Sequence, residues 1–443
     1  MLLKHLQDRY LAGEWGEIVE RVAAKLAAED VELEAEFAEV LQKKRFLPAG
    51  NTLLAGVCEL TPNCSVLGWV SDDNFDEILA LSKKLWTQRT GIGYNLSGMH
   101  DPVSALRTLS RANDAIDLGH RPKRGNMAVL NSDHPRIREF ITCKARDGDI
   151  YNFNISVAVP RAGDIDEDLL AYIASLAWRT GDPGLVFLDN GEQYGPNRAD
   201  DLQPVVTCVP CGEQFMHAYE TCNLGSVNLN ADDCCLDANV LEHTVRVAVQ
   251  MLDRVIDQLV FPDERLEKVS LAARRIGLGV TGWADALQRR GIAYNSKAAL
   301  EWARDLSKFI TQVAEDESKQ LAEKYGACAY GGGEYRNISM TCIAPTGGIT
   351  GLTENEGYAI EPFFKEATTV DYRAHIDMQL AWQSGIHNAV SKTVNLPRTA
   401  SINKVFQVYK YAMKKGCKGI TVYRDGCKQH QPVALVRCIG CEQ

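Results

Sequence analysis

Two cysteines and a carboxylate stand close together in the middle of the chain, at a spacing that could support chemistry on a small substrate. The stretch from Cys208 to Glu213 reads Cys-Val-Pro-Cys-Gly-Glu. Pro210 lacks a backbone donor and Gly212 permits unusual backbone angles, so we expect a tight loop here. Residues i and i+2 of extended backbone point to the same side. The sequence therefore predicts that Cys211 and Glu213 are presented together.

The same cysteines allow other interpretations. Cys208-x-x-Cys211 has the spacing of a zinc half-site or of a thioredoxin-like redox pair. A zinc site needs a second close pair, and the candidate, Cys438-x-x-Cys441, lies more than 200 residues away. Another thiol, Cys222, follows eleven residues after Cys211. A buried structural thiol is a further interpretation, which suits Cys208 better than Cys211.

Composition limits the function classes. The chain has 443 residues, 45% of them hydrophobic, and a formal net charge of −10, which argues against a general nucleic-acid or anionic-membrane surface. No apolar run reaches the ~18–20 residues that span a bilayer. The charged N-terminus does not resemble a secretion signal. Fourteen cysteines without such a signal predict free thiols in a reducing cytoplasm, which is the host's if the protein is viral.

The elements that must position these residues alternate along the chain. Residues 1–48 look helical, because apolar side chains recur at roughly three-to-four spacing from 18 to 41. Beyond them helices and strands alternate without a linker, which predicts one large α/β domain. The expected helices are 75–86, 134–144, 169–178, 241–259, 298–324 and 402–414. The expected strands are 152–159, 184–188, 225–229, 275–282, 339–344 and 419–423, with a turn that leads into a strand at 60–67 and the start of another at 90–97. The turn at 345–350 could cradle an anion or be a plain tight turn.

Nine motifs occur in the order of a known family, and together they resemble the catalytic subunit of ribonucleotide reductase, especially its adenosylcobalamin-dependent (class II) type. The matching segments begin at Asn63-Cys64-Ser65, Gly91-Ile92-Gly93, Arg124-Gly125-Asn126, Asp133-His134-Pro135, Asn152-Phe153-Asn154, Pro210-Cys211-Gly212-Glu213, Cys222-Asn223-Leu224, Ala344-Pro345-Thr346 and Gly419-Ile420-Thr421. They cover about residues 48–426, in a short, possibly phage-type, form of the protein.

The resemblance implies the fold and the division of the chain. It implies a small helical region at 1–48 and a ten-stranded α/β barrel of two five-stranded halves at 49–425. A central finger loop inside the barrel would carry Cys211 at its tip. Residues 426–443 would be a flexible C-terminal redox tail.

The catalytic roles are also implied by the resemblance. Cys211 would carry the thiyl radical that removes the 3′ hydrogen of a ribonucleotide, and Glu213 would be the general base at the 3′ hydroxyl. Cys64 and Cys222 would be the reducing pair, and would end as a disulfide when the 2′ hydroxyl leaves as water. A mobile dithiol must reset that disulfide by thiol–disulfide exchange. Cys438 and Cys441 of the tail would be that dithiol.

Binding residues follow from the same family motifs. Those expected to contact the substrate are Thr52, Ser65, Val209, Asn223, Pro345, Thr346, Gly347, Gly348, Ile349 and Thr350. Asp72 and Arg124 would belong to a site for a dNTP or ATP effector. The family has asparagine where this chain has Val209, a side chain that cannot hydrogen-bond. Asn223 and Asn63 are candidates to replace that contact.

The source of the radical has two interpretations. Tyr423 is followed by Arg424, as in the cobalamin type, whereas relatives with a separate metal-containing radical subunit have two adjacent tyrosines. This favours adenosylcobalamin, with no metal site formed by residues of the chain. The alternative is a large subunit whose radical enters through Tyr423 from a second subunit. Thioredoxin or glutaredoxin, a ribonucleoside di- or triphosphate and a second copy of the chain are the expected partners, with no membrane and no nucleic acid. A non-catalytic, redox-sensing nucleotide-binding protein is the alternative from another class.

Overall fold

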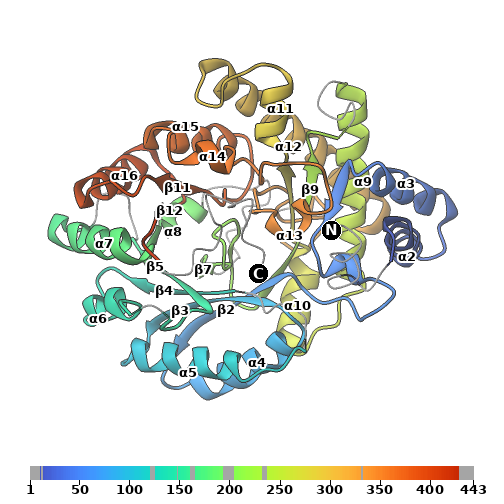
Figure 1. Cartoon of the computed structure of the whole chain (residues 1–443). Helices are drawn as coiled ribbons and strands as arrows, with labels where there is room; N and C mark the ends of the chain where they lie inside the picture. The colour runs from blue at the N-terminus through green and yellow to red at the C-terminus, as the bar shows by residue number, and fades with distance from the viewer. Residues whose placement is uncertain are drawn as a thin grey trace.

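We describe a computed structural model of the chain. It describes residue 10 and residues 13–119, 125–146, 148–159, 165–192, 204–231, 237–330 and 333–428. The strands run through the middle of the molecule and the helices surround them (Figure 1). The strands are β1 Phe46–Pro48, β2 Cys64–Ser71, β3 Gly91–Gly98, β4 Asn126–Asn131, β5 Phe153–Ala158, β6 Gly184–Val186, β7 Thr207–Cys208, β8 Phe215–Met216, β9 Glu220–Asn228, β10 Ile276–Thr281, β11 Thr393–Leu396 and β12 Gly419–Arg424.

The strands form a barrel of two halves. Strands β2 to β6 are parallel neighbours in chain order and make the first half. The halves meet in antiparallel pairs, β2 with β9 and β6 with β12. In the second half β9 pairs with β10 and β11 with β12, both parallel. Parallel bridges from Leu278 to Thr341 and from Ile343 to Val390 connect these pairs. The predicted barrel of two five-stranded halves is thereby confirmed, although the expected strand at 339–344 is present only as these bridges.

Amphipathic helices cover the outside of the barrel. Their apolar faces meet the sheet, as in α9, where the buried positions include Val245, Val249, Leu252 and Ile256. The helices are α2 Trp15–Ala27, α3 Val31–Gln42, η1 Thr52–Leu54, α4 Phe75–Thr87, α5 Pro102–Asp114, α6 Ile137–Thr142, α7 Glu167–Thr180, α8 Leu188–Glu192, α9 Ala238–Asp257, α10 Glu264–Ala273, α11 Trp283–Arg289, α12 Lys297–Tyr325, α13 Gly347–Thr350, α14 Phe364–Ala367, α15 Tyr372–Gln383 and α16 Ile402–Lys415.

The predicted helical region at 1–48 contains two helices and a strand. Helix α2 ends where Ala28 and Glu29 take positive φ angles of 50° and 74°. Asp30 then begins α3, because its side chain accepts a hydrogen bond from the backbone N–H of Leu33 at 3.1 Å. The last three residues were predicted to be helical, but they form β1. This segment pairs with β9 and so continues the sheet.

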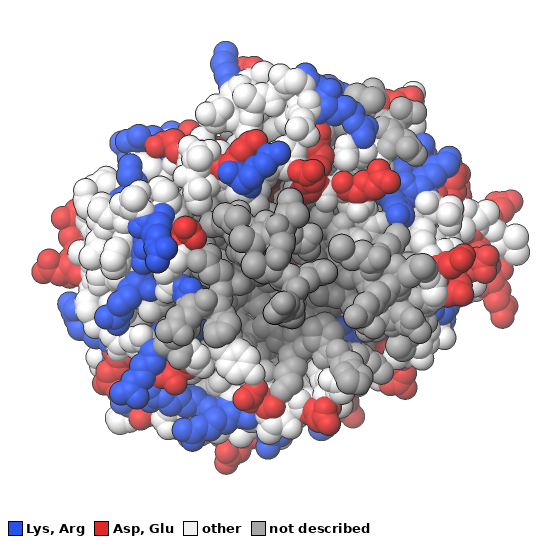
Figure 2. All heavy atoms as spheres, in the orientation of Figure 1, with Lys and Arg blue, Asp and Glu red and all other residues white. Residues whose placement is uncertain are grey.

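The molecule carries charges of both signs on its surface. Lys and Arg side chains lie interspersed with Asp and Glu around the periphery of the face seen in Figure 2. Among the described helices, none has the length and apolar character needed to cross a membrane.

Candidate active site

A short hairpin lies inside the ring of strands (Figure 1). We call residues 207–216 the finger; it consists of β7, a turn and β8, and Cys208 pairs with Phe215. Gly212 adopts a φ of +76° and donates its N–H to the Val209 carbonyl at 2.9 Å. The tight loop predicted from the proline and the glycine therefore occurs here. Cys211 lies in its turn and is exposed.

Contacts from the first half of the barrel hold the finger. The side-chain amide of Asn95 donates to the Val206 carbonyl at 2.8 Å, and that of Asn154 donates to the Pro210 carbonyl at 2.9 Å. A Cβ atom on Gly93 would lie 2.2 Å from the carbonyl oxygen of Cys208. Only glycine allows the finger backbone to approach β3 this closely.

A cavity of about 560 Å³ opens beside the turn of the finger. Cys211 and Gly212 line it together with residues of β5, β6, β11 and β12. Gly347 and Gly348 of α13 and Tyr423 of β12 belong to the same lining. The thiol of Cys211 therefore faces a space large enough for a small organic molecule.

Glu213 is buried and one of its carboxylate oxygens lacks a partner. The residue is 1% exposed, and its Oε2 atom makes no hydrogen bond to any described residue. Burial raises the pKa of Glu213 to about 7, because a charged carboxylate is poorly solvated in the barrel interior. A carboxyl group with such a pKa can take up and release a proton near neutral pH.

Cys64 and Cys222 lie directly opposite each other in the antiparallel β2–β9 pair. Opposed residues in such pairs have Cα atoms about 4.5–5.5 Å apart, which is within the range of disulfides. The two thiols are hydrogen-bonded, which lowers the pKa of Cys222, but burial and the nearby Glu213 leave that pKa above its usual value. The pair can therefore be held as two thiols and can close to a disulfide without moving the strands.

Val209 fills an apolar part of the barrel interior. It is fully buried in a cluster that includes Val66, Cys222 and Cys342, with Cys64 packed against the same cluster. Val209 therefore makes hydrophobic contacts close to the cysteine pair, at a position where the family resemblance implies a polar asparagine.

Ser65 and Asn223, both predicted to contact the substrate, have side chains on the outer face of the sheet. Ser65 pairs with Ile92, which belongs to the core beneath the helices, and with Thr221, whose hydroxyl donates to Ser270 of α10 at 2.8 Å. Asn223 lies two residues after Thr221 and shares its face. The substrate contacts predicted for Ser65 and Asn223 would therefore be made by their backbone, and they stay a prediction. Because the period of a strand is two, only their backbone borders the interior.

Asn63 was the other candidate to replace the missing asparagine. Its side-chain oxygen accepts a hydrogen bond from the backbone N–H of Leu224 at 3.1 Å. Thr207 was not predicted, yet its buried hydroxyl has no partner among the described residues. It lies on the finger two residues before Val209.

The turn at 345–350 places three of its residues, Pro345, Gly347 and Gly348, on the cavity wall. Thr346 has a φ of 55°, and its hydroxyl lies 3.1 Å from that of Thr281 and accepts a hydrogen bond from the Ala359 N–H at 2.8 Å. That side chain holds the turn in shape. Ile349 and Thr350 are buried in α13. Thr52 begins η1 and is also buried.

The remaining predicted residues lie elsewhere. Asp72 is exposed at the end of β2, where its carboxylate accepts a hydrogen bond from the His100 N–H at 3.0 Å. Arg124, Cys438 and Cys441 lie outside the described residues. Within the described part of the chain, no group of three His, Cys, Asp or Glu side chains could hold a metal ion.

Two residues at the base of the finger, Gln214 within it and Asn388 outside it, were not predicted. Gln214 follows Glu213 directly, and its amide nitrogen donates to the Ile276 carbonyl at 3.3 Å. Asn388 reaches the finger from the segment before β11 and binds Phe215. The position of Gln214 next to a predicted catalytic residue is a signal that could have identified it. Asn388 carries no such signal.

Comparisons with known proteins agree with this geometry. Residues 166–339 and 356–423 match the family model described as ribonucleotide reductase, barrel domain. The chain is 32% identical to a vitamin B12-dependent ribonucleoside-diphosphate reductase of Mycobacterium tuberculosis, over 96% of this chain and 79% of that protein. A protein of the same description from Thermoplasma acidophilum is 30% identical, over 89% of this chain and 65% of the relative. The fold matches the class Id ribonucleotide reductase alpha subunit of Actinobacillus ureae with a TM-score of 0.81 at 18% identity, covering 96% of both chains.

Proposed function

Because the chain belongs to the ribonucleotide reductase family, we propose that it reduces ribonucleotides through a thiyl radical on Cys211. It is an oxidoreductase of this class. The observation that carries the assignment of roles is the direct pairing of Cys64 with Cys222 inside a barrel that also encloses the finger. The barrel interior then holds a thiol that borders the cavity, a buried carboxyl group two residues further along the finger, and a dithiol on the neighbouring strands β2 and β9.

The first steps use the finger. A C–H bond beside a hydroxyl is too inert for acid–base chemistry alone, whereas a sulfur radical can exchange a hydrogen atom with it at little energetic cost. Cys211 takes the 3′ hydrogen, and Glu213 accepts the proton of the 3′ hydroxyl. The missing partner at Oε2 of Glu213 and the raised pKa both suit this role.

Reduction uses the pair on β2 and β9. Cys64 and Cys222 supply two electrons and two protons as the 2′ hydroxyl leaves as water, and they become a disulfide. Cys438 and Cys441 then reduce that disulfide by exchange, and thioredoxin or glutaredoxin reduces the tail in turn. The turn at 345–350 contacts the substrate phosphates through its backbone and its glycines.

The cavity beside Cys211, which the substrate would enter, also has wall residues that could contact part of an organic cofactor. The relatives from M. tuberculosis and T. acidophilum are described as vitamin B12-dependent, which supports adenosylcobalamin here. Tyr358 and Phe364 provide aromatic surface on the wall of the cavity, and Lys392 and Asn395 provide polar groups. When bound, the cofactor supplies the unpaired electron that Cys211 requires. In the alternative, Tyr423, which lines the same cavity, passes the radical from a second subunit.

Turnover with adenosylcobalamin as the only added radical source tests the proposal. We expect the purified chain to convert a ribonucleoside diphosphate to its deoxy form with adenosylcobalamin and a dithiol reductant, without a second protein. The same assay with the triphosphate identifies the substrate class, and addition of single dNTPs reveals effector control. Activity that appears only with a radical-generating subunit would replace the cofactor assignment. If no deoxynucleotide forms either with adenosylcobalamin or with a radical-generating subunit, the proposed function is contradicted.

The Val209→Asn variant tests the departure from the family pattern. We expect its activity to equal or exceed that of the wild type, because asparagine restores the hydrogen bond to the substrate that valine cannot make. Its amide would enter an apolar cluster, so its melting temperature should fall unless substrate is present. Steady-state turnover and thermal unfolding measure both effects. A large loss of turnover in a folded variant would contradict the prediction.

The Glu213→Gln variant tests the carboxyl group. Turnover should fall by about 10²- to 10⁴-fold, the usual contribution of a general base, and the rise of wild-type kcat/KM with pH up to about 7 should disappear.

The stability of Glu213→Gln should increase relative to the wild type, in contrast to its turnover. The pKa of Glu213 is raised from 4.5 to about 7, so the wild type loses stability as pH rises between these values and no more above them. Chemical unfolding should therefore show the variant gaining stability over the wild type from pH 5 to pH 7. An equal difference at both pH values would contradict the burial argument.

A further inference from the structure

The edge of the finger is completed by a segment from the other half of the barrel. Strands β7 and β8 have two residues each, and a hairpin of that length is not stable alone. Asn388 accepts a hydrogen bond from the Phe215 N–H at 2.8 Å and donates one to the Phe215 carbonyl at 3.1 Å. The next residue, Ala389, donates its N–H to the Glu213 carbonyl at 3.0 Å. Asn388, through its side chain, and Ala389, through its backbone N–H, thus supply hydrogen bonds to residues 213–215, directly before and at the start of β8.

The same asparagine also fixes the side chain of Gln214. Its amide nitrogen donates to Oε1 of Gln214 at 2.8 Å, and the nitrogen of Gln214 donates to the Ile276 carbonyl. A Cβ atom on Gly277 would lie 2.5 Å from that Gln214 nitrogen, so glycine leaves the room that the amide needs. Both polar ends of Gln214, which is fully buried, are therefore satisfied beside the catalytic carboxyl group.

Asn388 is itself held in place. Lys418, which is fully buried directly before β12, donates from Nζ to the carbonyls of His387 at 2.9 Å and of Asn388 at 2.5 Å. The N–H of Asn388 donates to the Thr341 carbonyl at 2.9 Å. The contact of Asn388 with the finger therefore rests on two further segments of the barrel, the bridge residue Thr341 and the residue before β12.

We propose that Asn388 is a positioning residue that fixes the base of the finger and thereby the placement of Glu213 and Cys211 relative to the substrate. The proposal rests on the proposed function for its catalytic consequence, but the anchoring itself can be tested without turnover. Asn388 touches no reacting group in this assignment; it acts through Gln214, Phe215 and the backbone of Glu213. A misplacement of a catalytic group by about 1 Å can cost about 10²-fold in rate.

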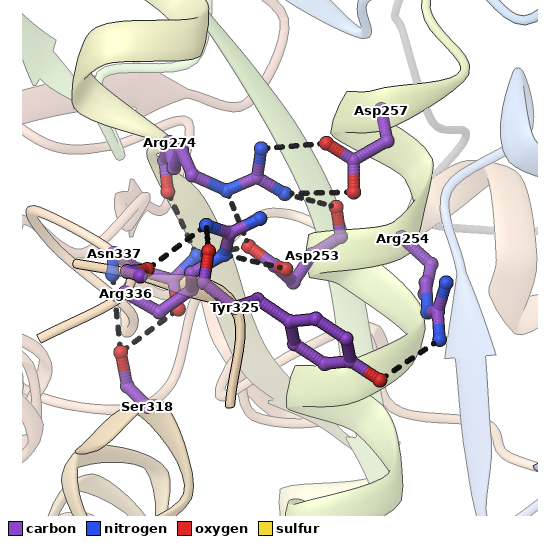
Figure 3. Close-up of polar contacts among 9 residues, drawn as sticks. Asp253, Arg254, Asp257, Arg274, Ser318, Tyr325, Arg336 and Asn337 are labelled. Carbon is purple, nitrogen blue, oxygen red and sulfur yellow. Dashed lines mark hydrogen bonds and ion pairs between the residues drawn. The ribbon is translucent and has the colours of Figure 1, made fainter. Parts of the chain in front are cut away.

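Asn337 offers a matched control. It is as buried as Asn388, and its side chain donates to Asp253 at 2.8 Å and to the Arg274 carbonyl at 2.9 Å and accepts from Ser318 at 2.9 Å. Figure 3 shows this network, which joins Asp253 of α9, Ser318 of α12 and Arg274 at the end of α10. Asn337→Ala should therefore destabilise the protein as Asn388→Ala does, without loosening the finger.

The kinetic test compares Asn388→Ala, Gln214→Ala, the double variant and Asn337→Ala. We expect Asn388→Ala to lower kcat by about 10²-fold with KM changed by less than about twofold, because the substrate still binds while the finger is misplaced. The double variant should be hardly worse than Asn388→Ala, since both residues act through one contact. Asn337→Ala should keep its kcat within about twofold. An equal loss of kcat in Asn388→Ala and Asn337→Ala would overturn the proposal. So would a double variant in which the losses of kcat from Asn388→Ala and Gln214→Ala add. If Asn388→Ala does not fold, Gln214→Ala alone decides by the same kcat and KM criterion.

A labelling test needs no activity. Cys208 lies at the base of the finger and is fully buried, as is Cys417 before β12. Maleimide labelling of the native protein, followed by peptide mass spectrometry, should modify Cys208 at least about tenfold faster in Asn388→Ala, because local opening exposes it. Cys417 should react at the wild-type rate. Unchanged labelling of Cys208 in the folded variant would overturn the anchoring. Faster labelling in a protein that reduces no ribonucleotide with any radical source would support the anchoring and contradict the proposed function.

Discussion

Replacing Cys211 by serine is expected to lower ribonucleotide reduction by at least about 10⁴-fold, in the range seen when the group that makes the covalent step of an enzyme is removed. The O–H bond of serine is too strong for its oxygen radical to form and to exchange hydrogen with a sugar C–H bond in a balanced way. The variant contains no second change that could take over the role of the thiol. Cys211 is exposed in a turn, so the variant should fold as well as the wild type. Deoxynucleotide formation and thermal unfolding of the same preparation measure both effects.

Cys58→Ser provides the control for this variant. Cys58 is a partly exposed thiol beyond η1, on a different pocket from Cys211. Its replacement should leave turnover within about twofold of the wild type. If Cys211→Ser kept more than about a tenth of the wild-type turnover, the radical would lie on another atom. The non-catalytic, redox-sensing interpretation would then be favoured.

The barrel could be predicted because its motifs occur in family order and its elements alternate. The long helices and β5, β10 and β12 lie where periodicity or motifs placed them, whereas β9 begins five residues before the strand expected at 225–229. The expected strand at 339–344 differs, because its residues make single bridges to β10 and to Val390 rather than a continuous ladder. At the other end, Phe46–Pro48 extends the sheet although the residues before it are helical. Short edge segments of this kind depend on their partner strand, which local sequence does not specify.

Within the site, chemistry was more predictable than the direction of side chains. Cys64 and Ser65 are neighbours in one family motif, yet the two-residue period of β2 turns only Cys64 towards the interior. Asn223 differs from Cys222 for the same reason. Asn388 could not have been found, because it contacts Phe215 across 173 residues of chain and no motif connects them. Contacts of this kind are set by how the two halves of the barrel close.

The reducing pair should define the stoichiometry of the reaction. Without external reductant, wild-type protein with its radical source should form about one product for each Cys64–Cys222 dithiol, plus one for each tail dithiol that resets it. A variant with Cys438 and Cys441 both changed to serine should then stop after about one product per chain. Rapid quenching with product counting, and mass spectrometry of the peptides that contain Cys64 and Cys222, measure the products and the disulfide.

Either Cys64→Ser or Cys222→Ser should remove even this first product. One remaining thiol supplies a single hydrogen atom and cannot close the disulfide that accounts for the second electron. Serine at position 222 also keeps the size of the side chain in its buried cluster, so loss of product in a folded variant reflects chemistry rather than packing. The two variants should fail to the same extent because their partners are opposed in one register pair. Sustained turnover by either variant would show that electrons reach the substrate by another route. If both variants fail while the tail variant still makes its first product, Cys64 and Cys222 reduce the sugar, and Cys438 and Cys441 only reduce the resulting disulfide.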